Sequence, residues 1–428
     1  MKIDFTLRLV TPAYAGGADQ TISDGIRPPT VKALLRFWWR TMHSDLPPQE
    51  LFKREARIFG STKTGQGLRI KPRGKVSGGE PQNAPVEERD IVHTYLAYGA
   101  VAWNNETRRP ETRCARIPQD YAVNFALSGN LSNPNDEEEI KKALWLFSVF
   151  GTLGSRSRRG WGSIKVDVIA CEGGWPNNLP DPCKAESAED CLEKIGVGLT
   201  AIFGTKTGIS LPVGVSEPQH TSFSPGTRIA LGAPQNDWYR AMEKIFMSFG
   251  HFHRALGAEF RHGLGKVGQD HNKRYGWLTN RPVATDITPA GSAFGLPHNA
   301  TFSIRTNKIF IAPGEAGATD PKKKIAGRRA SPVFFKVIRT ENHYIPLVLW
   351  LPSLFLPNDP RYQIHMKAEA ERGGYPPTPI TYGGNQAIRD FFDGENPSIV
   401  YYPQNSDSNT PGTCWKGILL QGWTEAVW

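Results

Sequence analysis

The chain has 428 residues, of which 39% are hydrophobic and 11% aromatic, and 51 Lys and Arg stand against 41 Asp and Glu. This composition excludes a disordered or collagen-like chain, and the length suggests two or three domains at about 150 residues each. The formal net charge of +10 is compatible with a nucleic-acid or anionic-surface partner, although many plain enzymes carry a similar excess.

The N-terminus begins with an alternation of apolar and polar residues over 3–9, which predicts a strand with one solvated face. Asp4, Arg8 and Pro12 interrupt the apolar run, so we do not expect a secretory signal despite the small residues that follow. The longest apolar stretch, 345–357, is too short to cross a bilayer. We therefore expect no contact with a membrane.

Five cysteines are present, an odd number without C-x-x-C spacing. This usage favours a reducing compartment over a disulfide framework, so we expect a cytoplasmic protein. Cys171, Cys183 and Cys191 are separated by twelve and eight residues, which matches no usual zinc pattern. We expect neither a metal nor another cofactor.

The stretch 25–43, GIRPPTVKALLRFWWRTMH, predicts a helix that Pro28 and Pro29 open, with Thr30 as its N-cap. On a helical projection its side chains form two arcs, each about 100° wide. The first arc is apolar and is predicted to face the core: Val31, Leu34, Leu35, Trp38 and Met42. The second is basic and is predicted to face a nucleic acid: Lys32, Arg36, Trp39, Arg40 and His43. On this face the Trp39 side chain would stack on a base or lie under an arginine. The alternative interpretation is that Trp39 packs against a neighbouring loop of the protein.

The elements that follow complete a β-α-β-β-α-β order, with one extra strand before the second helix. This order is typical of a ferredoxin-like α+β fold with an antiparallel sheet. The second helix, over 133–151, has an acidic first turn and ends at Gly151. The predicted strands are 68–74, 92–103, 121–129 and 163–170.

A partial internal repeat relates 147–164 to 246–267, because both read F-x-x-F-G and later R-x-G-x-G. It suggests two copies of one domain type. We predict an N-terminal domain over 1–172, a linker over 173–196 and a second domain of the same type, with additions, over 197–428. The last part also contains predicted strands at 299–312, 332–340 and 344–352.

Three segments combine glycine with basic residues: 151–163, 254–266 and 320–332. Glycine lets backbone N–H groups approach an anion, and arginine binds phosphate through a planar fork. Solvated turns are the plain alternative, and no G-K-[ST] follows the glycines, which excludes a P-loop. The basic residues and histidines singled out here are Arg156, Arg158, Arg159, His253, Arg254, Arg261, His262, Lys266, Arg328 and Arg329.

Catalytic signatures are scarce. The sequence has no G-x-S-x-G, no H-E-x-x-H and no Cys–His signature. Asp19 and Asp24 follow the first strand and are candidates to hold a metal or to orient a 2′-hydroxyl, although loop carboxylates are ordinarily just solvated.

Four segments, TPAYAGG, IRPPTVKALLRFWWR, EARIFGST and GTLGSRSRRGWGSI, together resemble the RAMP proteins of type III CRISPR systems. More narrowly, they are similar to the family of the first-numbered subunit of the type III-B (Cmr) RNA-silencing complex. The resemblance covers 1–166 and, more loosely, 293–297 and 327–332; over 345–428 there is none. It implies two tandem RAMP domains of ferredoxin-like (RRM-like) fold.

The resemblance also implies a non-catalytic role in antiviral defence, near the 3′ end of the guide (CRISPR) RNA, where such a subunit helps engage target RNA. Guide RNA, target RNA and other Cmr subunits are the implied partners. The sheet lacks the aromatic signature of an RRM, so we expect loops and helix faces to contact RNA. The residues predicted to do so are Arg27, Lys32, Arg36, Trp39, Arg40, His43, Arg156, Arg158, Arg159, His253, Arg254, Arg261, His262, Lys266, Arg328 and Arg329.

Two other functions are retained as hypotheses. The first is an endoribonuclease with His253 or His43 as general base, or with Asp24 and a metal ion. The second is a scaffold that contacts only neighbouring proteins.

Overall fold

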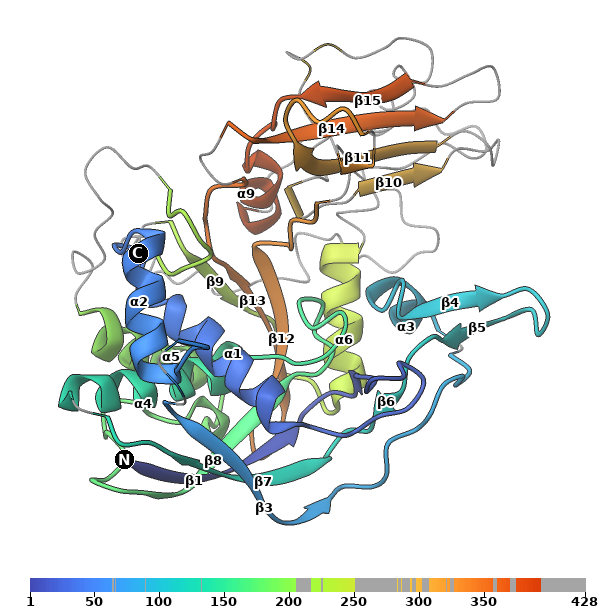
Figure 1. The fold of residues 1–428 in the computed structure, drawn as a ribbon. Helices are drawn as coiled ribbons and strands as arrows, with labels where there is room; N and C mark the ends of the chain where they lie inside the picture. Colours follow the sequence, from blue (N-terminus) through green and yellow to red (C-terminus); the bar gives the residue numbers. More distant parts are fainter. Residues whose placement is uncertain are drawn as a thin grey trace. The chain divides into compact units, whose positions relative to one another are not determined.

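Figure 1 shows a computed structural model of the chain. It describes residues 1–393 with gaps at 64, 66, 89, 132, 205–216, 225, 251–282, 284–285, 287–292, 295–297, 302–307, 321, 324–326, 357–359 and 370–374. The chain divides into two compact units. One comprises Met1–Phe246 and Phe334–Pro352, and the other comprises Met247–Val333 and a segment that starts at Ser353.

The first unit is built on a four-stranded sheet of the order β3-β7-β1-β8. Strand β1 (Lys2–Leu9) pairs antiparallel with both β7 (Ala122–Ser128) and β8 (Ile164–Cys171), and β7 pairs antiparallel with β3 (Arg69–Ser77). This is the strand order of a ferredoxin-like sheet. The predicted mixture of helices and antiparallel strands is confirmed.

One face of this sheet carries the helices (Figure 1). Helix α1 (Pro28–Arg40) packs against α4 (Pro134–Phe150), and α2 (Pro48–Phe59), which the sequence did not predict, lies beside them. The strands alternate as predicted, so that Phe5 and Leu7 of β1 are fully buried. Trp38 is 2% exposed, which confirms the apolar arc of α1 as a core face.

Two local predictions are wrong. The N-cap of α1 is Arg27 and not Thr30, because the helix already begins at Pro28, whose fixed φ suits a first turn. The predicted strand 92–103 is instead a helix, α3 (Ile91–Leu96), followed by β4 (Val101–Asn104). Strand β4 forms a hairpin with β5 (Arg109–Thr112). A short ladder between β2 (Ala13–Tyr14) and β6 (Arg116–Ile117) completes this region.

The interval 173–196, predicted as a linker, packs on the first core. It holds the 3-10 helix η1 (Pro182–Lys184) and the first half of α5 (Ala188–Phe203), whose N-cap Ser187 accepts a hydrogen bond from the backbone N–H of Asp190. Cys191 and Ile195 are fully buried there. The Pro, Gly and Asn content indicated a linker, but the apolar periodicity of α5 decides its placement.

A second sheet of the first unit has the order β12-β13-β9. Its strands are β9 (Arg228–Leu231), β12 (Val333–Arg339) and β13 (Tyr344–Trp350). Helix α6 (Trp238–Ile245) follows β9, and a single π-helical turn, η2 (Phe246–Gly250), follows α6. The boundary between the two units therefore does not fall at 196/197, where the sequence analysis placed it.

The second unit contains a sheet of the order β10-β11-β14-β15. Its elements are β10 (His298–Thr301), β11 (Lys308–Glu315), β14 (Tyr362–Glu369), β15 (Tyr375–Ile380) and helix α9 (Gln386–Asp393). Ile309, Ile364 and Met366 belong to its apolar core. Within the described ranges, no helix of either unit is long and apolar enough to cross a membrane.

A buried lysine joins β12 to α4. Lys336 is 1% exposed, and its Nζ donates a hydrogen bond to the carbonyl oxygen of Ser148. Burial lowers the pKa of Lys336 to about 7, although the nearby Cys183 and Asp181 act in the opposite direction. The folded protein therefore holds this amine partly neutral at pH 7, which an unfolded lysine is not.

Replacing this amine should change the pH dependence of stability. Between about pH 7 and 8.5 the unfolded chain binds the Lys336 proton and the folded chain releases it, so wild-type stability should rise with pH. The rise from this group is at most about 1.4 kcal/mol per pH unit. Lys336→Met should lose this rise, as measured by urea denaturation.

The exposed Lys53→Met is the matched control and should keep the wild-type slope. The pH range of the test ends below 9.0, the ordinary pKa of a cysteine thiol. Above it the Cys183 thiol, whose pKa burial raises, would add its own pH dependence. Equal slopes for wild type and Lys336→Met would contradict a buried, partly neutral amine.

Candidate nucleic-acid interface

Four segments of the first unit surround a cleft of about 380 Å³, which we call the glycine cleft. One wall is the loop between β2 and α1, from Ala15 to Arg27. The other walls are Gly99–Ala100 before β4, Arg113–Cys114 after β5 and 153–155 after α4. The cleft thus joins the predicted Gly-rich bend to the predicted Gly–Arg segment, which lies about 130 residues further along the chain.

Backbone hydrogen bonds hold these walls together. The N–H of Ser155 donates to the carbonyl of Tyr14 at 2.7 Å, and the N–H of Ala15 donates to the carbonyl of Ala115 at 3.0 Å. The N–H of Ala115 in turn donates to the carbonyl of Gln20 at 2.9 Å. These bonds fix three chain segments, so the cleft exists before any ligand arrives.

Two glycines of the cleft have a positive φ, a backbone conformation that other residues rarely adopt. Gly154 has φ +85°, and a Cβ there would lie 2.7 Å from the carbonyl oxygen of Tyr14. Gly99 has φ +93°, and its Cβ would lie 2.2 Å from Nη2 of Arg156. Both positions therefore require glycine, and the walls expose peptide backbone to a ligand.

The charge of the cleft is positive. Arg27 and Arg113 line it, and the guanidinium of Arg156 lies against Gly99. Helix α1 also begins here, and because Pro28 and Pro29 carry no N–H, Thr30 provides the first backbone donor of the helix. Arginine forks, open backbone and a helix N-terminus together suit an anion of the phosphate class.

The carboxylates near the cleft have local partners. Oδ1 of Asp19 accepts hydrogen bonds from the N–H and the hydroxyl of Thr21 at 2.8 and 2.7 Å, which lower the pKa of Asp19. Asp24 lies 3.5 Å from Arg27, and both side chains are half exposed. The described residues include no group of three or more His, Cys, Asp or Glu side chains that could hold a metal ion.

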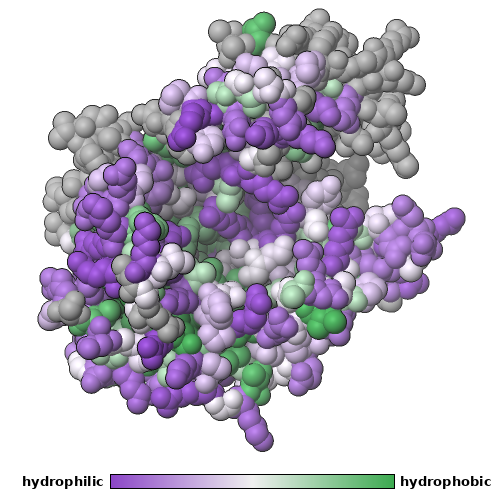
Figure 2. Space-filling model, in the orientation of Figure 1, coloured by the Kyte–Doolittle hydropathy of each residue, from purple (hydrophilic) through white to green (hydrophobic). Residues whose placement is uncertain are grey.

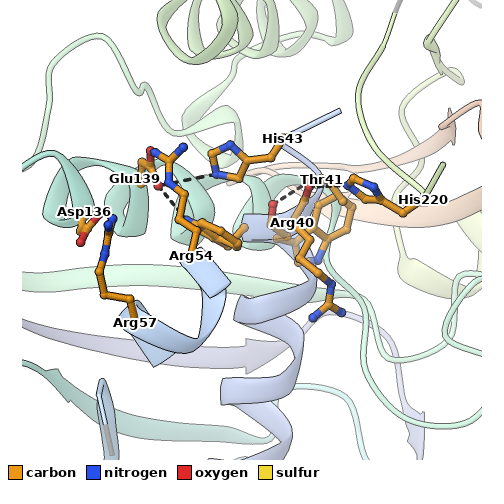
Figure 3. Close-up of polar contacts among 10 residues, drawn as sticks. Arg40, Thr41, His43, Arg54, Arg57, Asp136, Glu139 and His220 are labelled. Carbon is orange, nitrogen blue, oxygen red and sulfur yellow. Dashed lines mark hydrogen bonds and ion pairs between the residues drawn. The ribbon is translucent and has the colours of Figure 1, made fainter. Parts of the chain in front are cut away.

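The prediction for the basic arc of α1 is wrong for Trp39 and His43. Trp39 is fully buried, and its Nε1 donates to Oε2 of Glu139 at 2.9 Å. Nε2 of His43 lies 3.6 Å from the same oxygen, and Arg54 of α2 donates to Oε1 (Figure 3). Glu139 of α4 gives the indole N–H a buried acceptor, so the ring can be buried completely and is not available to stack on a base.

The remaining residues of the arc are also engaged. Nε of Arg36 and Nη1 of Arg40 donate to Oε1 of Glu55 at 2.7 and 2.6 Å. Nζ of Lys32 donates to the carbonyl of Leu68 at 2.6 Å, and burial lowers the pKa of Lys32. The arc is thus a polar packing surface between helices and not an open basic face, although Arg36 and Arg40 stay about one-third exposed.

The three arginines of the Gly–Arg segment have different environments. Arg156 is exposed, whereas the guanidinium of Arg158 lies 4.3 Å from the ring centroid of Phe334 in β12. Burial lowers the pKa of Arg159 to about 10, and its backbone forms a bridge to Phe335. Arg158 and Arg159 therefore tie this segment to the second sheet.

The other predicted residues lie elsewhere. Arg328 is exposed in the second unit, and Nη2 of Arg329 there donates to Oγ of Ser353 at 2.6 Å. His253, Arg254, Arg261, His262 and Lys266 lie outside the described residues. Of the predicted residues that the structure describes, Arg27 and Arg156 alone lie at the glycine cleft. Arg113 was not among the residues predicted from the sequence. The signal that could have indicated it is the basic run over 108–116, which precedes the predicted strand 121–129.

Comparison with known proteins shows what the first part of this unit is similar to. The family model of the RAMP superfamily matches residues 6–165, in agreement with the resemblance seen in the sequence. The curated relative "CRISPR system Cmr subunit Cmr1-2" of Pyrococcus furiosus is 25% identical over 180 residues, which are 39% of this chain and 95% of the relative.

Two solved structures are also similar to the chain. The apo crystal structure of Cmr1 from Pyrococcus furiosus has 15% identity and a TM-score of 0.46, covering 84% of this chain and 90% of that one. A chain from the cryo-EM structure of the type III-B Cmr-β complex bound to cognate target RNA has 12% identity and a TM-score of 0.45, covering 82% and 95%.

Removing the charge of Glu139 should destabilise the first unit. Burial opposes ionisation, but His43, the indole N–H of Trp39 and Arg54 hold the pKa of the Glu139 carboxyl below its usual value. Glu139→Gln should therefore cost about 2–3 kcal/mol of unfolding free energy near pH 7. Urea denaturation measures this loss.

Glu50→Gln is the control, because its side chain on α2 is 56% exposed and pairs with Lys53, which is 74% exposed. It should unfold like wild type. The difference between wild type and Glu139→Gln should shrink as the pH falls below 4.5, the ordinary pKa of a Glu carboxyl. A variant as stable as wild type at pH 7 would contradict the central role of this carboxylate.

Proposed function

We propose that the chain is an RNA-binding subunit of a type III-B CRISPR (Cmr) effector complex, and that its glycine cleft holds backbone phosphates of RNA. The observation that carries this proposal is the cleft itself, where open glycine backbone, Arg27 and Arg113 meet the N-terminus of α1. The RAMP match over 6–165 and the similarity to a Cmr subunit support the choice of RNA and of the complex.

The position of the subunit in the complex and its partners are inferred from the family resemblance. We infer that the subunit lies near the 3′ end of the guide RNA, helps engage target RNA and contacts other Cmr subunits in the cytoplasm. The order β9, α6, β12, β13 and the sheet order β12-β13-β9 correspond to the first four elements of a ferredoxin-like fold. This supports a second ferredoxin-like domain.

A non-catalytic subunit is favoured over an endoribonuclease by the described residues. His43 is buried beside Glu139, which removes it from any substrate. Asp24 faces Arg27, and Asp19 accepts from Thr21. Burial raises the pKa of the Cys114 thiol in the cleft wall, so it is a poor nucleophile.

The double variant Arg27→Ala, Arg113→Ala should bind RNA more weakly and show a shallower salt dependence. Each arginine that no longer binds a phosphate of a single strand should reduce the slope of log K against log salt by about 0.7. Fluorescence anisotropy of labelled RNA over a range of salt concentrations measures both quantities. Because both arginines bind phosphate and not bases, the decrease in affinity should be the same for different sequences.

Arg240→Ala, which removes an arginine of similar exposure on α6, is the control and should bind like wild type. Unchanged affinity of the double variant would overturn the role of the glycine cleft. Incubation of the same RNA with and without Mg²⁺ tests the alternative: cleavage that disappears in Asp24→Asn or His253→Ala would establish an endoribonuclease.

A further inference from the structure

The face of the four-stranded sheet opposite the helices is open, and no described helix covers it (Figure 1). Strand alternation places Lys2, Asp4, Thr6 and Arg8 of β1 on this face, whereas Ile3, Phe5 and Leu7 point to the core. The paired positions of β7 carry Ser128 and Asn124, and those of β8 carry Asp167 and Lys165. The face is therefore mostly polar.

Strand β3 adds a row of basic side chains to the same face. Arg69, Lys71 and Arg73 stand opposite Ser128, Ala126 and Asn124 of β7, and the three basic residues lie on the outer strand of the sheet. Residues two apart on a strand are about 6.8 Å apart, so these three cationic groups form an evenly spaced row. The spacing is of the order of the distance between successive phosphates in an extended strand.

Few carboxylates neutralise this face. Asp4 lies 3.6 Å from Arg73, and Asp167 lies 3.1 Å from Lys165. Lys2, Arg69 and Lys71 have no ion-pair partner among the residues that the structure describes, and Arg8 makes one hydrogen bond, of 3.4 Å, to the carbonyl of Asp120. The face therefore carries a net positive charge, which comes from β3 and β1 on the two sides of β7.

Protection of an edge strand does not explain this pattern. Basic side chains on an edge strand hinder pairing with another sheet, and this function would be enough to explain the basic residues of β3. It does not extend to Lys2 and Arg8, because β1 is an interior strand, paired on both sides by β7 and β8. Cations on interior and edge strands alike indicate a ligand that lies across the sheet.

We propose that this open face, defined by Lys2, Arg8, Arg69, Lys71 and Arg73 and called the sheet face, is a second RNA-binding surface. Its ligand is the sugar–phosphate backbone of single-stranded RNA, since a row of cations on a strand follows an extended polyanion. The defining residues include no aromatic side chain, so the sheet face binds without stacking bases and without sequence preference. The choice of RNA rests on the proposed function.

The sheet face lies apart from the glycine cleft in the fold, because none of its five residues belongs to the cleft walls. The two surfaces can therefore be removed separately. The sheet-face variant is the triple Lys2→Ala, Arg69→Ala, Lys71→Ala, which leaves the ion pair of Arg73 with Asp4 in place. The control triple is Lys53→Ala, Lys184→Ala, Arg240→Ala, which removes equal charge elsewhere in the first unit.

The test measures binding of uridine and adenosine homopolymers to the full chain across a salt series. The sheet-face triple should weaken both equally and reduce the salt slope by about 2, since three phosphate contacts contribute about 0.7 each. The control triple should bind like wild type, and both triples should keep the wild-type melting temperature.

Each adverse result has a separate meaning. If the sheet-face triple binds like wild type while the glycine-cleft variant is impaired, the sheet face is not an RNA surface and the proposed function stands. If wild type itself binds neither homopolymer nor guide RNA, both proposals fail. If the triple binds RNA normally but no longer enters a reconstituted complex, the face serves a protein neighbour and the inference is overturned.

Discussion

The first unit depends on carboxylates that neutralise the basic side of its first helix. Glu55 of α2 accepts from Arg36 and Arg40, and Glu139 of α4 is shared by Trp39, His43 and Arg54. Without these acceptors, burying a tryptophan between arginines would leave unpaired charge in a region of low dielectric constant, which is costly. With them, α1, α2 and α4 form one layer above the sheet (Figure 1).

This neutralisation also determines which surfaces remain for a polyanion. Most cations of the helical layer are committed to carboxylates inside the protein, so the helix faces offer little free positive charge. The N-terminal end of α1 with its glycine cleft and the sheet face are two exposed basic surfaces of this unit. Figure 2 shows hydrophilic side chains over much of the visible surface, so polarity alone does not distinguish a binding surface. A cluster of basic residues without a carboxylate partner among the described residues, such as Lys2, Arg69 and Lys71 of the sheet face, is a more specific mark.

The sequence predicted the four-stranded sheet, α1 and α4 of the first unit, but not α2, α3 or the contacts between helices. Alternation over 3–9 and the apolar arc of α1 are local patterns, and both predicted the structure correctly. The fate of Trp39 depends on Glu139, one hundred residues away, and no local pattern contains that pairing. A charged arc facing water and a charged arc facing acidic helices look the same in a single helix. The prediction of a strand over 92–103 was wrong for a related reason, because its apolar run fits the pattern of a helix as well as that of a strand.

The Gly–Arg segment shows how one motif serves two purposes. Its first part, up to Arg156, forms a wall of the glycine cleft, where Gly154 and Ser155 approach Tyr14. Its second part holds β12, because Arg158 covers Phe334 and the N–H of Phe335 donates to the carbonyl of Arg158 at 3.3 Å. Three arginines that look equivalent in sequence thus divide between the edge of the cleft and the scaffold. The division follows from the backbone: the chain turns at Gly154 and again at Arg156, both with positive φ, and the residues beyond Arg156 contact the aromatic side chains of β12.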